Sequence, residues 1–331
     1  MAPNPLLALP HADADRERVE EELRKAVEAP TAAMTEMAGH LLGAGGKRVR
    51  PLFAIAAGGI AEGHEGPAAL DVVRGGVSVE LVHLGSLLHD DVIDEAETRR
   101  GIDSVNARWG NLRAILAGDF LLAKASEIAA SLGTEVAGLL AATIGRLCEG
   151  EVIELDDAYD VTRTEDAYLR AIEGKTASLL STACRIGGIV AELPRADIDR
   201  LTDFGLAYGM AFQIVDDILD VVATDEQLGK PAGHDLVEGA YNLPTLLALA
   251  GPEGDELRTL LGGPRGRALE RARALVRSSD GIDLSIDVAR RYVDRACELL
   301  QPYEHRPTAV GLQGASRHLL ASLDATRAQV P

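Results

Sequence analysis

The sequence predicts an all-α fold, and three observations support this. Apolar residues recur at helical spacing along most of the chain, whereas no run of alternating β-branched residues is bounded by hairpin turns. Aromatic residues, which favour strands, make up only 3% of the 331 residues. No stretch is long or biased enough to be a flexible linker, and no repeat of fixed period is present. We therefore expect a single helical domain covering residues 1–331, with a sizeable core.

The first helix is expected around residues 19–27. Its apolar side chains recur at i, i+4, i+7 and i+8, which places them on one face: Val19, Leu23, Ala26 and Val27. On the solvated side we expect two i,i+4 ion pairs, Glu20 with Arg24 and Glu21 with Lys25.

The helices between residues 68 and 250 are rich in Ala, Gly and Leu, and their charges are confined to a few places. Helices of this composition are expected at the centre, with more amphipathic helices around them. One outer helix is expected near the C-terminus, where the apolar pattern recurs at Tyr292, Val293, Ala296, Leu299 and Leu300.

The charge and cysteine content exclude some classes of protein. Asp and Glu number 52 against 33 Lys and Arg, a net charge of −19, so a nucleic-acid partner is not expected. The longest stretch free of these four residue types, 239–252, contains two prolines and is too short for a membrane span. The N-terminus lacks the basic start of a secretory signal. Cys148, Cys184 and Cys297 lack metal-ligand spacing and are expected to be buried thiols, so we expect a soluble cytoplasmic protein.

Two clusters of Asp residues are the strongest functional signal. Residues 87–94 (Leu-Leu-His-Asp-Asp-Val-Ile-Asp) and 213–220 (Gln-Ile-Val-Asp-Asp-Ile-Leu-Asp) each place three carboxylates in an apolar helix: Asp90, Asp91 and Asp94, then Asp216, Asp217 and Asp220. Residues four apart share a helical face. Too few basic residues lie nearby to neutralise six buried carboxylates, so metal cations are expected. Oxygen ligands favour Mg²⁺, which combines one or two carboxylates with waters and substrate phosphates.

A third match to this pattern, Asp156, Asp157 and Asp160, is expected not to bind metal. Residues 162–165 (Thr-Arg-Thr-Glu) have the spacing of a capping box, which predicts the start of the next helix. Asp160 would then lie in a loop, and the three carboxylates would not share a face.

Basic residues next to glycines occur at 46–50, 99–101, 174–175 and 229–230. Arg captures phosphate with two hydrogen bonds, Lys acts as a point charge, and glycine lets backbone approach a ligand. Together with twin Mg²⁺ sites, they predict a pocket for two polyphosphate groups, one bridged by metal and one held by Arg and Lys. The segment at 174–176 lacks the upstream glycine and the preceding strand of a P-loop, so nucleotide binding is not expected there.

Over nearly its whole length the chain resembles the trans-polyprenyl diphosphate synthases, which elongate isoprenoid chains. The motifs occur in the family's order: residues 46–51 (Gly-Lys-Arg-Val-Arg-Pro), 80–83 (Glu-Leu-Val-His), 88–94, 99–101 (Arg-Arg-Gly), 174–176 (Gly-Lys-Thr), 212–220 and 229–231 (Gly-Lys-Pro). The resemblance implies an all-α bundle of the isoprenoid synthase type around a deep central cavity, and a homodimer.

The resemblance also implies a role for each matched residue. The six Asp would bind Mg²⁺ bridging the diphosphate of the allylic substrate, which Arg99, Lys175, Thr176, Gln213 and Lys230 would hold. Isopentenyl diphosphate would be held by Lys47, Arg50, His83 and Arg100. The catalytic residues would be the six Asp with Arg99 and Lys175. One departure is at 239–244, where family members often read Gly-Lys-x-Thr-Leu-Pro; here Ala240 removes a cation from the allylic site.

The implied reaction starts when Mg²⁺ and the cations stabilise the departing pyrophosphate, which leaves an allylic carbocation. The double bond of isopentenyl diphosphate attacks this cation, and loss of a proton completes a five-carbon extension. No side-chain base is evident, so pyrophosphate is the expected proton acceptor. Three alternatives stay open: a class I terpene cyclase, a metal phosphohydrolase using His89 and Asp90, and an inactive subunit of a heteromeric synthase.

The sequence also bears on product length. By resemblance, the growing chain runs from Asp90 toward the N-terminal end of the same helix. Short-chain members carry a bulky aromatic four or five residues before the first Asp, where this chain has Ser86 and Gly85. The further turns present only Val82, Val79, Ser78 and Gly75, although Phe120 could form a floor on the opposite wall. Because one helical turn matches about one isoprene unit, we expect a long product of about C30 to C50. A short-chain farnesyl or geranylgeranyl diphosphate synthase is the alternative, and close helix packing is an alternative reason for Gly85 and Ser86.

Overall fold

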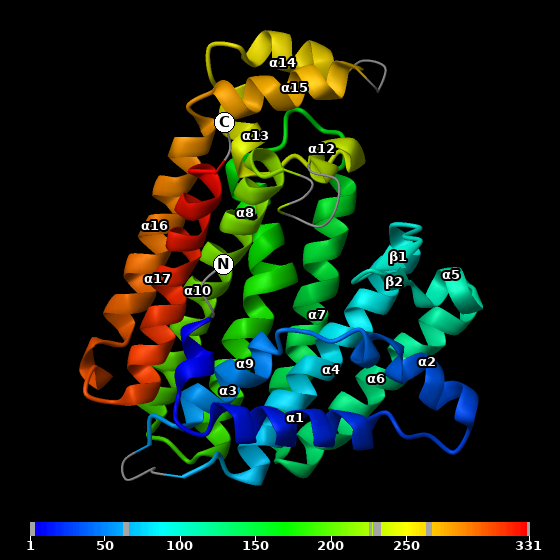
Figure 1. Cartoon of the computed structure of the whole chain (residues 1–331), viewed down its shortest axis with the longest axis vertical. Coiled ribbons are helices and arrows are strands. Elements are labelled where there is room, and N and C mark those ends of the chain that lie inside the picture. Colours follow the sequence, from blue (N-terminus) through cyan, green and yellow to red (C-terminus); the bar gives the residue numbers. More distant parts are fainter. Residues whose placement is uncertain (1–3, 62–65, 225–226, 228–232, 263–266, 330–331) are drawn as a thin grey trace.

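The computed structural model describes residues 4–61, 66–224, 227, 233–262 and 267–329. Its long helices run side by side along the molecule, and shorter ones cross the two ends (Figure 1). The helices are α1 (Ala12–Ala26), α2 (Ala32–Gly43), α3 (Val49–Gly58), α4 (Leu70–Ile93), α5 (Val105–Trp109), α6 (Asn111–Ser131), α7 (Thr134–Asp156), α8 (Glu165–Ile172), α9 (Ser178–Val190), α10 (Arg195–Val222), α12 (His234–Glu238), α13 (Leu243–Leu249), α14 (Gly254–Leu261), α15 (Arg267–Ser278), α16 (Gly281–Leu299) and α17 (Pro307–Arg327). Short 3-10 turns, η1 (Pro5–Ala8) and η3 (Gln301–Tyr303), and a π-helical turn, η2 (Glu173–Ala177), complete them. The expected all-α fold is confirmed.

The centre of the bundle is formed by α4 and α10, which are buried along most of their length. Helix α4 packs against α3, α6 and α9, and α10 packs against α9, α16 and α17. Small residues permit this close packing: a Cβ on Gly187 of α9 would lie 2.1 Å from the carbonyl oxygen of Ala54 in α3. Each central helix carries one predicted Asp cluster in its last turns, so the fold brings both clusters toward one end of the bundle.

The first and last predicted helices form with the expected buried faces. Val19, Leu23 and Val27 are buried on or just after α1, and Val293, Ala296, Leu299 and Leu300 are buried on or just after α16. Lys25 forms the expected ion pair with Glu21, at 2.8 Å. The prediction that Glu20 pairs with Arg24 was wrong, because the Glu20 carboxylate binds Arg48, which lies just before α3.

Two further expectations need correction. Cys184 is buried, but Cys297 is half-buried and Cys148 is exposed on α7; all three thiols are free. The described part also contains one small hairpin, β1 (Thr98–Arg99) paired with β2 (Ile102–Asp103). Its two-residue loop, Arg100 and Gly101, has φ values of 54° and 78°, as tight hairpin turns require. None of the described helices combines the length and apolar character that crossing a bilayer requires.

Candidate active site

The first Asp cluster lies where α4 ends. Asp90 and Asp91 belong to its last turn, and the backbone N–H of Asp94 donates to the carbonyl oxygen of Asp90 at 2.8 Å. The Asp91 side chain is buried, and its Oδ1 lies 2.6 Å from both Nε and Nη2 of Arg99. The pKa of Asp90 is raised to about 7, mainly by burial and in part by the neighbouring carboxylates of Glu151 and Asp94, while Lys175 opposes the rise. The contact between Arg99 and Asp91 thus holds this predicted substrate-binding residue beside the first Asp cluster.

The second Asp cluster lies near the end of α10. Asp216 is exposed, whereas Asp217 and Asp220 are buried. The hydroxyl of Tyr168 donates to Oδ2 of Asp217 at 2.6 Å, and the amide of Gln213 donates to Oδ1 at 2.8 Å. Burial holds the pKa of Asp217 well above its usual range. The sequence reasoning missed Tyr168, because nothing in the sequence of α8 shows which helix it faces.

A cavity of about 480 Å³ opens beside both clusters. Its walls include Asp94, Asp217, Lys175, Thr176 and Gln213, so five predicted residues for the allylic site come together. Ala240 also lines this cavity, at the position where the family often has Lys. Lys230 lies outside the described residues.

Lys175 is held by two carboxylates that the sequence reasoning missed. Its Nζ lies 2.7 Å from Glu151 and 2.6 Å from Glu154, both on α7. A signal was present, since two acids three residues apart in an apolar helix share a face. Gly174 lets its backbone approach α7 closely, because a Cβ on it would lie 2.8 Å from the carbonyl oxygen of Arg146.

A second cavity, of about 380 Å³, collects the residues predicted for isopentenyl diphosphate. Lys47, Arg50, His83 and Arg100 all line it, together with Phe212 of α10. The Nε of Arg50 is buried and has no hydrogen-bond partner among the described residues. Burial and the neighbouring Arg50 hold the pKa of His83 well below its usual range, so this imidazole is neutral near pH 7. The cavity is strongly cationic and suits a polyanion.

The third Asp match does not form a shared carboxylate face. Asp156 ends α7, and Asp160 lies in a loop, where its Oδ1 accepts from the backbone and hydroxyl of Thr162. The next helix starts two residues later than the capping box predicts, with Thr164 as its N-cap. Asp157 lies 3.1 Å from the buried guanidinium of Arg163, which lines the first cavity. Asp157 thus supports the wall of the cavity.

The donor set fits a metal that substrate completes. Among the described residues, no three His, Cys, Asp or Glu side chains are grouped closely enough to hold an ion alone. Asp91 is the most enclosed carboxylate of the first cluster, and Asp217 and Asp220 are both buried in the second, while Asp90 and Asp216 are more open. An Mg²⁺ ion that takes one or two carboxylates, waters and substrate phosphates is compatible with this arrangement.

The proposed tunnel wall on α4 is partly a packing surface. A Cβ on Gly85 would lie 3.1 Å from the carbonyl oxygen of Gly118 on α6, and one on Gly75 would lie 2.6 Å from Ile186 of α9. Gly85 is therefore explained by close helix packing, the alternative reason given for it. The Ser86 hydroxyl donates to the carbonyl oxygen of His83 at 3.0 Å, and its side chain is only half-buried.

An all-α bundle that holds an acidic cavity and a cationic cavity, lined by neighbouring residues of α10, is the arrangement expected of a helical enzyme that handles diphosphates. The family model described as polyprenyl synthetase matches residues 31–278. The chain belongs to this polyprenyl synthetase family.

Individual relatives agree. The heptaprenyl diphosphate synthase component 2 of Geobacillus stearothermophilus is 41% identical over 290 residues, 86% of this chain and 89% of that protein. The nonaprenyl diphosphate synthase of Mycobacterium tuberculosis is 41% identical over 279 residues, 83% and 81% of the two chains. A solved polyprenyl synthase from Caulobacter crescentus, complexed with calcium and isoprenyl diphosphate, is 32% identical with a TM-score of 0.88 and covers 96% of this chain and 97% of its own.

Proposed function

We propose that the chain is a trans-polyprenyl diphosphate synthase that condenses isopentenyl diphosphate with an allylic diphosphate to make a long-chain product. One observation carries the proposal: the same two helices line both cavities. Helix α10 contributes Phe212 to the cationic cavity and Gln213 to the acidic one. Helix α4 contributes His83 to the cationic cavity, and its last residue, Ile93, lines the acidic one together with the adjacent Asp94. Two diphosphates bound in these cavities would lie side by side.

The residues divide the chemistry between them. The two Asp clusters would hold Mg²⁺, which would neutralise charge on the departing pyrophosphate. Asp91 and Asp217, each bound to a neighbouring side chain, would also orient their clusters. Lys175 would turn from its two carboxylates toward the allylic diphosphate, since a lysine on a flexible stem is a mobile point charge. Thr176 and Gln213, linked at 2.8 Å, would donate to the same group. Lys47, Arg50, His83 and Arg100 would fix isopentenyl diphosphate.

A long product, of about C30 to C50, is supported by Ser86, a small and half-buried residue one turn before Asp90 on α4, where each turn rises about 5.4 Å. Two relatives are named as heptaprenyl and nonaprenyl diphosphate synthases, which agrees with this length. One of them is named as component 2 of its enzyme. We propose that the present chain is active without a second component, because it retains all six Asp and both cavities.

We also propose a homodimer. The outward faces of α6 and α7 expose large apolar side chains, among them Leu112, which is 80% exposed, Leu116 and Val152. Such patches typically mark interfaces. Light scattering after size exclusion should give twice the chain mass of 34.9 kDa. A monomer mass at micromolar concentration would contradict this assembly.

Steady-state kinetics with each substrate varied in turn test the two-cavity assignment. Lys47→Ala and Arg100→Ala should chiefly raise KM for isopentenyl diphosphate, whereas Lys175→Ala should chiefly affect the allylic substrate. Asp90→Ala and Asp216→Ala should each lower kcat by about a hundredfold or more, because they remove stabilisation of the departing charge. Asp255→Ala, on an exposed position of α14, is the control. Equal effects of all cation variants on both substrates would contradict the assignment.

A further inference from the structure

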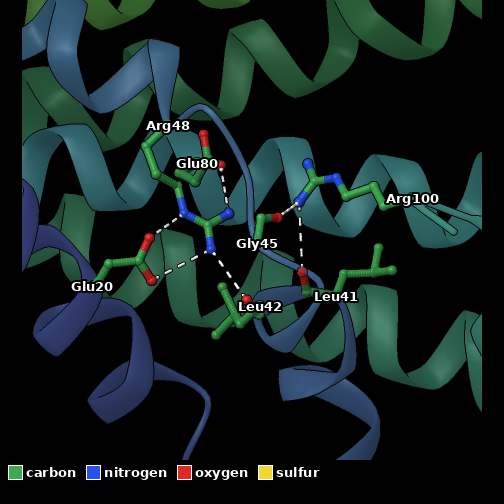
Figure 2. A network of polar contacts seen from close by, with 7 residues as sticks. All are labelled: Glu20, Leu41, Leu42, Gly45, Arg48, Glu80 and Arg100. Atoms are coloured by element: carbon green, nitrogen blue, oxygen red, sulfur yellow. Dashed lines mark hydrogen bonds and ion pairs between the residues drawn. The ribbon is translucent and has the colours of Figure 1, made fainter. Parts of the chain in front are cut away.

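A largely buried group of charges borders the cationic cavity. Figure 2 shows the guanidinium of Arg48 between the carboxylates of Glu20, from α1, and Glu80, from α4. Its Nε and Nη2 donate to the two oxygens of Glu20 at 2.6 and 3.4 Å, and its Nη1 donates to Glu80 at 3.3 Å. The side chains of Arg48 and Glu80 are only 1% and 3% exposed. Three charges from distant segments are therefore fixed together, with Arg48 and Glu80 shielded from water and Glu20 partly exposed.

The segment that this group holds has no regular structure of its own. Residues 45–48 join α2 to α3, and their neighbouring carbonyl groups are bound by guanidinium groups (Figure 2). Arg48 donates to the carbonyl oxygen of Leu42 at 3.4 Å, and Arg100 donates to those of Gly45 and Leu41 at 2.5 and 3.5 Å. These carbonyls lie at the C-terminal end of α2, where positive charge is favourable. The path of the loop thus depends on side chains.

The backbone at Arg48 also needs support. Its φ of 46° and ψ of 42° lie in the left-handed region, which is unfavourable for residues other than glycine and asparagine. This turn carries the chain from Lys47, on the cavity wall, into the first turn of α3, which holds Arg50 on the same wall. Both guanidiniums lie over Gly46, since a Cβ there would be 2.7 Å from Nη1 of Arg48 and 3.0 Å from Nη1 of Arg100.

We infer that Glu20 and Glu80 are positioning residues for the isopentenyl diphosphate site: acting through Arg48, they fix the 45–48 loop so that Lys47 and Arg50 meet the diphosphate. The inference rests on the proposed function of this cavity. Glu20 is the informative member, because it comes from α1 and is not among the residues that line the cavity. Helix α1 thereby takes part in a site that it does not touch.

Glu80 allows positioning to be distinguished from a purely electrostatic role. Its carboxylate also attracts Arg50 and Arg100, and both belong to the cavity. If Glu80 served only to lower the positive potential, Glu80→Gln would strengthen anion binding and lower KM for isopentenyl diphosphate. If it fixes Arg48, the same variant loses a charge-assisted hydrogen bond, and KM rises.

The test uses Glu20→Gln, Arg48→Lys and Glu80→Gln in the full chain. We expect each to raise KM for isopentenyl diphosphate by about tenfold, because a neutral amide or a single ammonium cannot replace the paired guanidinium–carboxylate contact. The KM for the allylic substrate should stay within about twofold, since these residues act on the other cavity. The double variant Glu20→Gln with Arg48→Lys should raise KM for isopentenyl diphosphate no more than the single variant with the larger effect. Both substitutions disrupt the same contact between Glu20 and Arg48, so their effects should not add.

A matched control is available on the same two helices. Glu22 of α1 binds Arg74 of α4 at 3.0 Å, so Glu22→Gln breaks an α1–α4 ion pair without touching the loop. We expect this variant to leave both KM values unchanged. Thermal unfolding of all variants shows whether they fold alike; should Arg48→Lys unfold, the partly exposed Glu20 still gives the decisive variant.

Two outcomes would overturn the inference: a KM in Glu20→Gln that matches the Glu22→Gln control, or a lower KM in Glu80→Gln. Calorimetric binding of isopentenyl diphosphate to wild type and Glu20→Gln adds a measurement that needs no turnover, and about tenfold weaker binding is expected. Wild-type protein that binds isopentenyl diphosphate but forms no prenyl product would defeat the proposed function instead, which keeps the two failures distinct.

Discussion

The hydroxyl of Tyr168 lies 2.6 Å from Oδ2 of Asp217, and this contact joins α8 to the end of α10 that carries the second Asp cluster. In the first cluster, Arg99 of β1 donates to Oδ1 of Asp91 and so joins the hairpin to the end of α4. In both clusters the middle Asp is buried and tied to a neighbouring side chain, while the first Asp is more open. We infer that the middle carboxylates, besides any contact with Mg²⁺, orient their clusters.

Replacing Tyr168 by Phe removes this hydrogen bond and little else. Partners that orient carboxylates near a metal typically contribute about 10- to 100-fold to metal affinity or activity, so kcat should fall by about tenfold and half-saturation by Mg²⁺ should shift upward. Tyr303→Phe is a matched control, because the Tyr303 hydroxyl donates to Asp197 outside both cavities. A Tyr168→Phe variant with the Mg²⁺ dependence of Tyr303→Phe would contradict the orienting role.

Asp157 is expected to matter for stability rather than for metal binding. Its removal leaves the Arg163 guanidinium, 3% exposed, without its ion-pair partner. The cost should be on the order of 2 kcal/mol, seen as a Tm several degrees lower, because a buried charge that loses its partner is strongly unfavourable. The exposed neighbour Asp156 provides the control variant, Asp156→Ala. If Asp157→Ala instead raised the Mg²⁺ requirement as Asp90→Ala does, the third cluster would belong to the metal site after all.

Product length should respond differently to the two positions before the first Asp. Ser86→Phe should shorten the product to about C15–C20, because an aromatic ring one turn above Asp90 blocks a path that lengthens by about one isoprene unit per turn. Gly85→Phe should mainly lower Tm, since its side chain would meet α6 at Gly118 and Leu122. Chromatography of dephosphorylated products and a melting curve separate these effects. An unchanged product from a folded Ser86→Phe variant would show that the tunnel runs elsewhere.

Ala240→Lys should restore a cation to the allylic cavity. Ala240 lines that cavity beside Glu238 and Asn242, so an ammonium there can reach a bound diphosphate. The KM for the allylic substrate should fall by about threefold or more, as expected for one added contact to phosphate, while the KM for isopentenyl diphosphate stays unchanged. Initial rates with each substrate varied decide this. A fall in both KM values would indicate a general field effect instead of a contact.

Much of the fold and the cavity walls could be predicted because they depend on local pattern. Helical periodicity fixed the buried faces of α1 and α16, and the Asp runs marked the ends of α4 and α10. The motifs also placed Lys47, Arg50, His83 and Arg100 in one cavity. These features follow from spacing along the chain and from family resemblance, so they need no knowledge of tertiary contacts.

What could not be predicted depends on which distant element a side chain faces. Glu20 has an i,i+4 partner in Arg24, yet its carboxylate binds the buried Arg48, a stronger site because it is desolvated and bidentate. Tyr168 could be assigned to the site only from its contact with Asp217. The spacing of Glu151 and Glu154 indicates a shared face of α7 but not that this face meets Lys175. Gly85 was ambiguous in sequence, and its contact with Gly118 resolved it.

The most direct test of the account is the product made by the purified chain alone. The protein is incubated with Mg²⁺, isopentenyl diphosphate and a labelled allylic primer, and the dephosphorylated prenols are separated by chromatography. Because Ser86, one turn before Asp90 on α4, is small and only half-buried, we expect long prenols of about C30 to C50, and no product when Mg²⁺ is chelated. A cyclic terpene, release of phosphate without elongation, a product of C15 or C20, or activity only after a second protein is added would contradict the account.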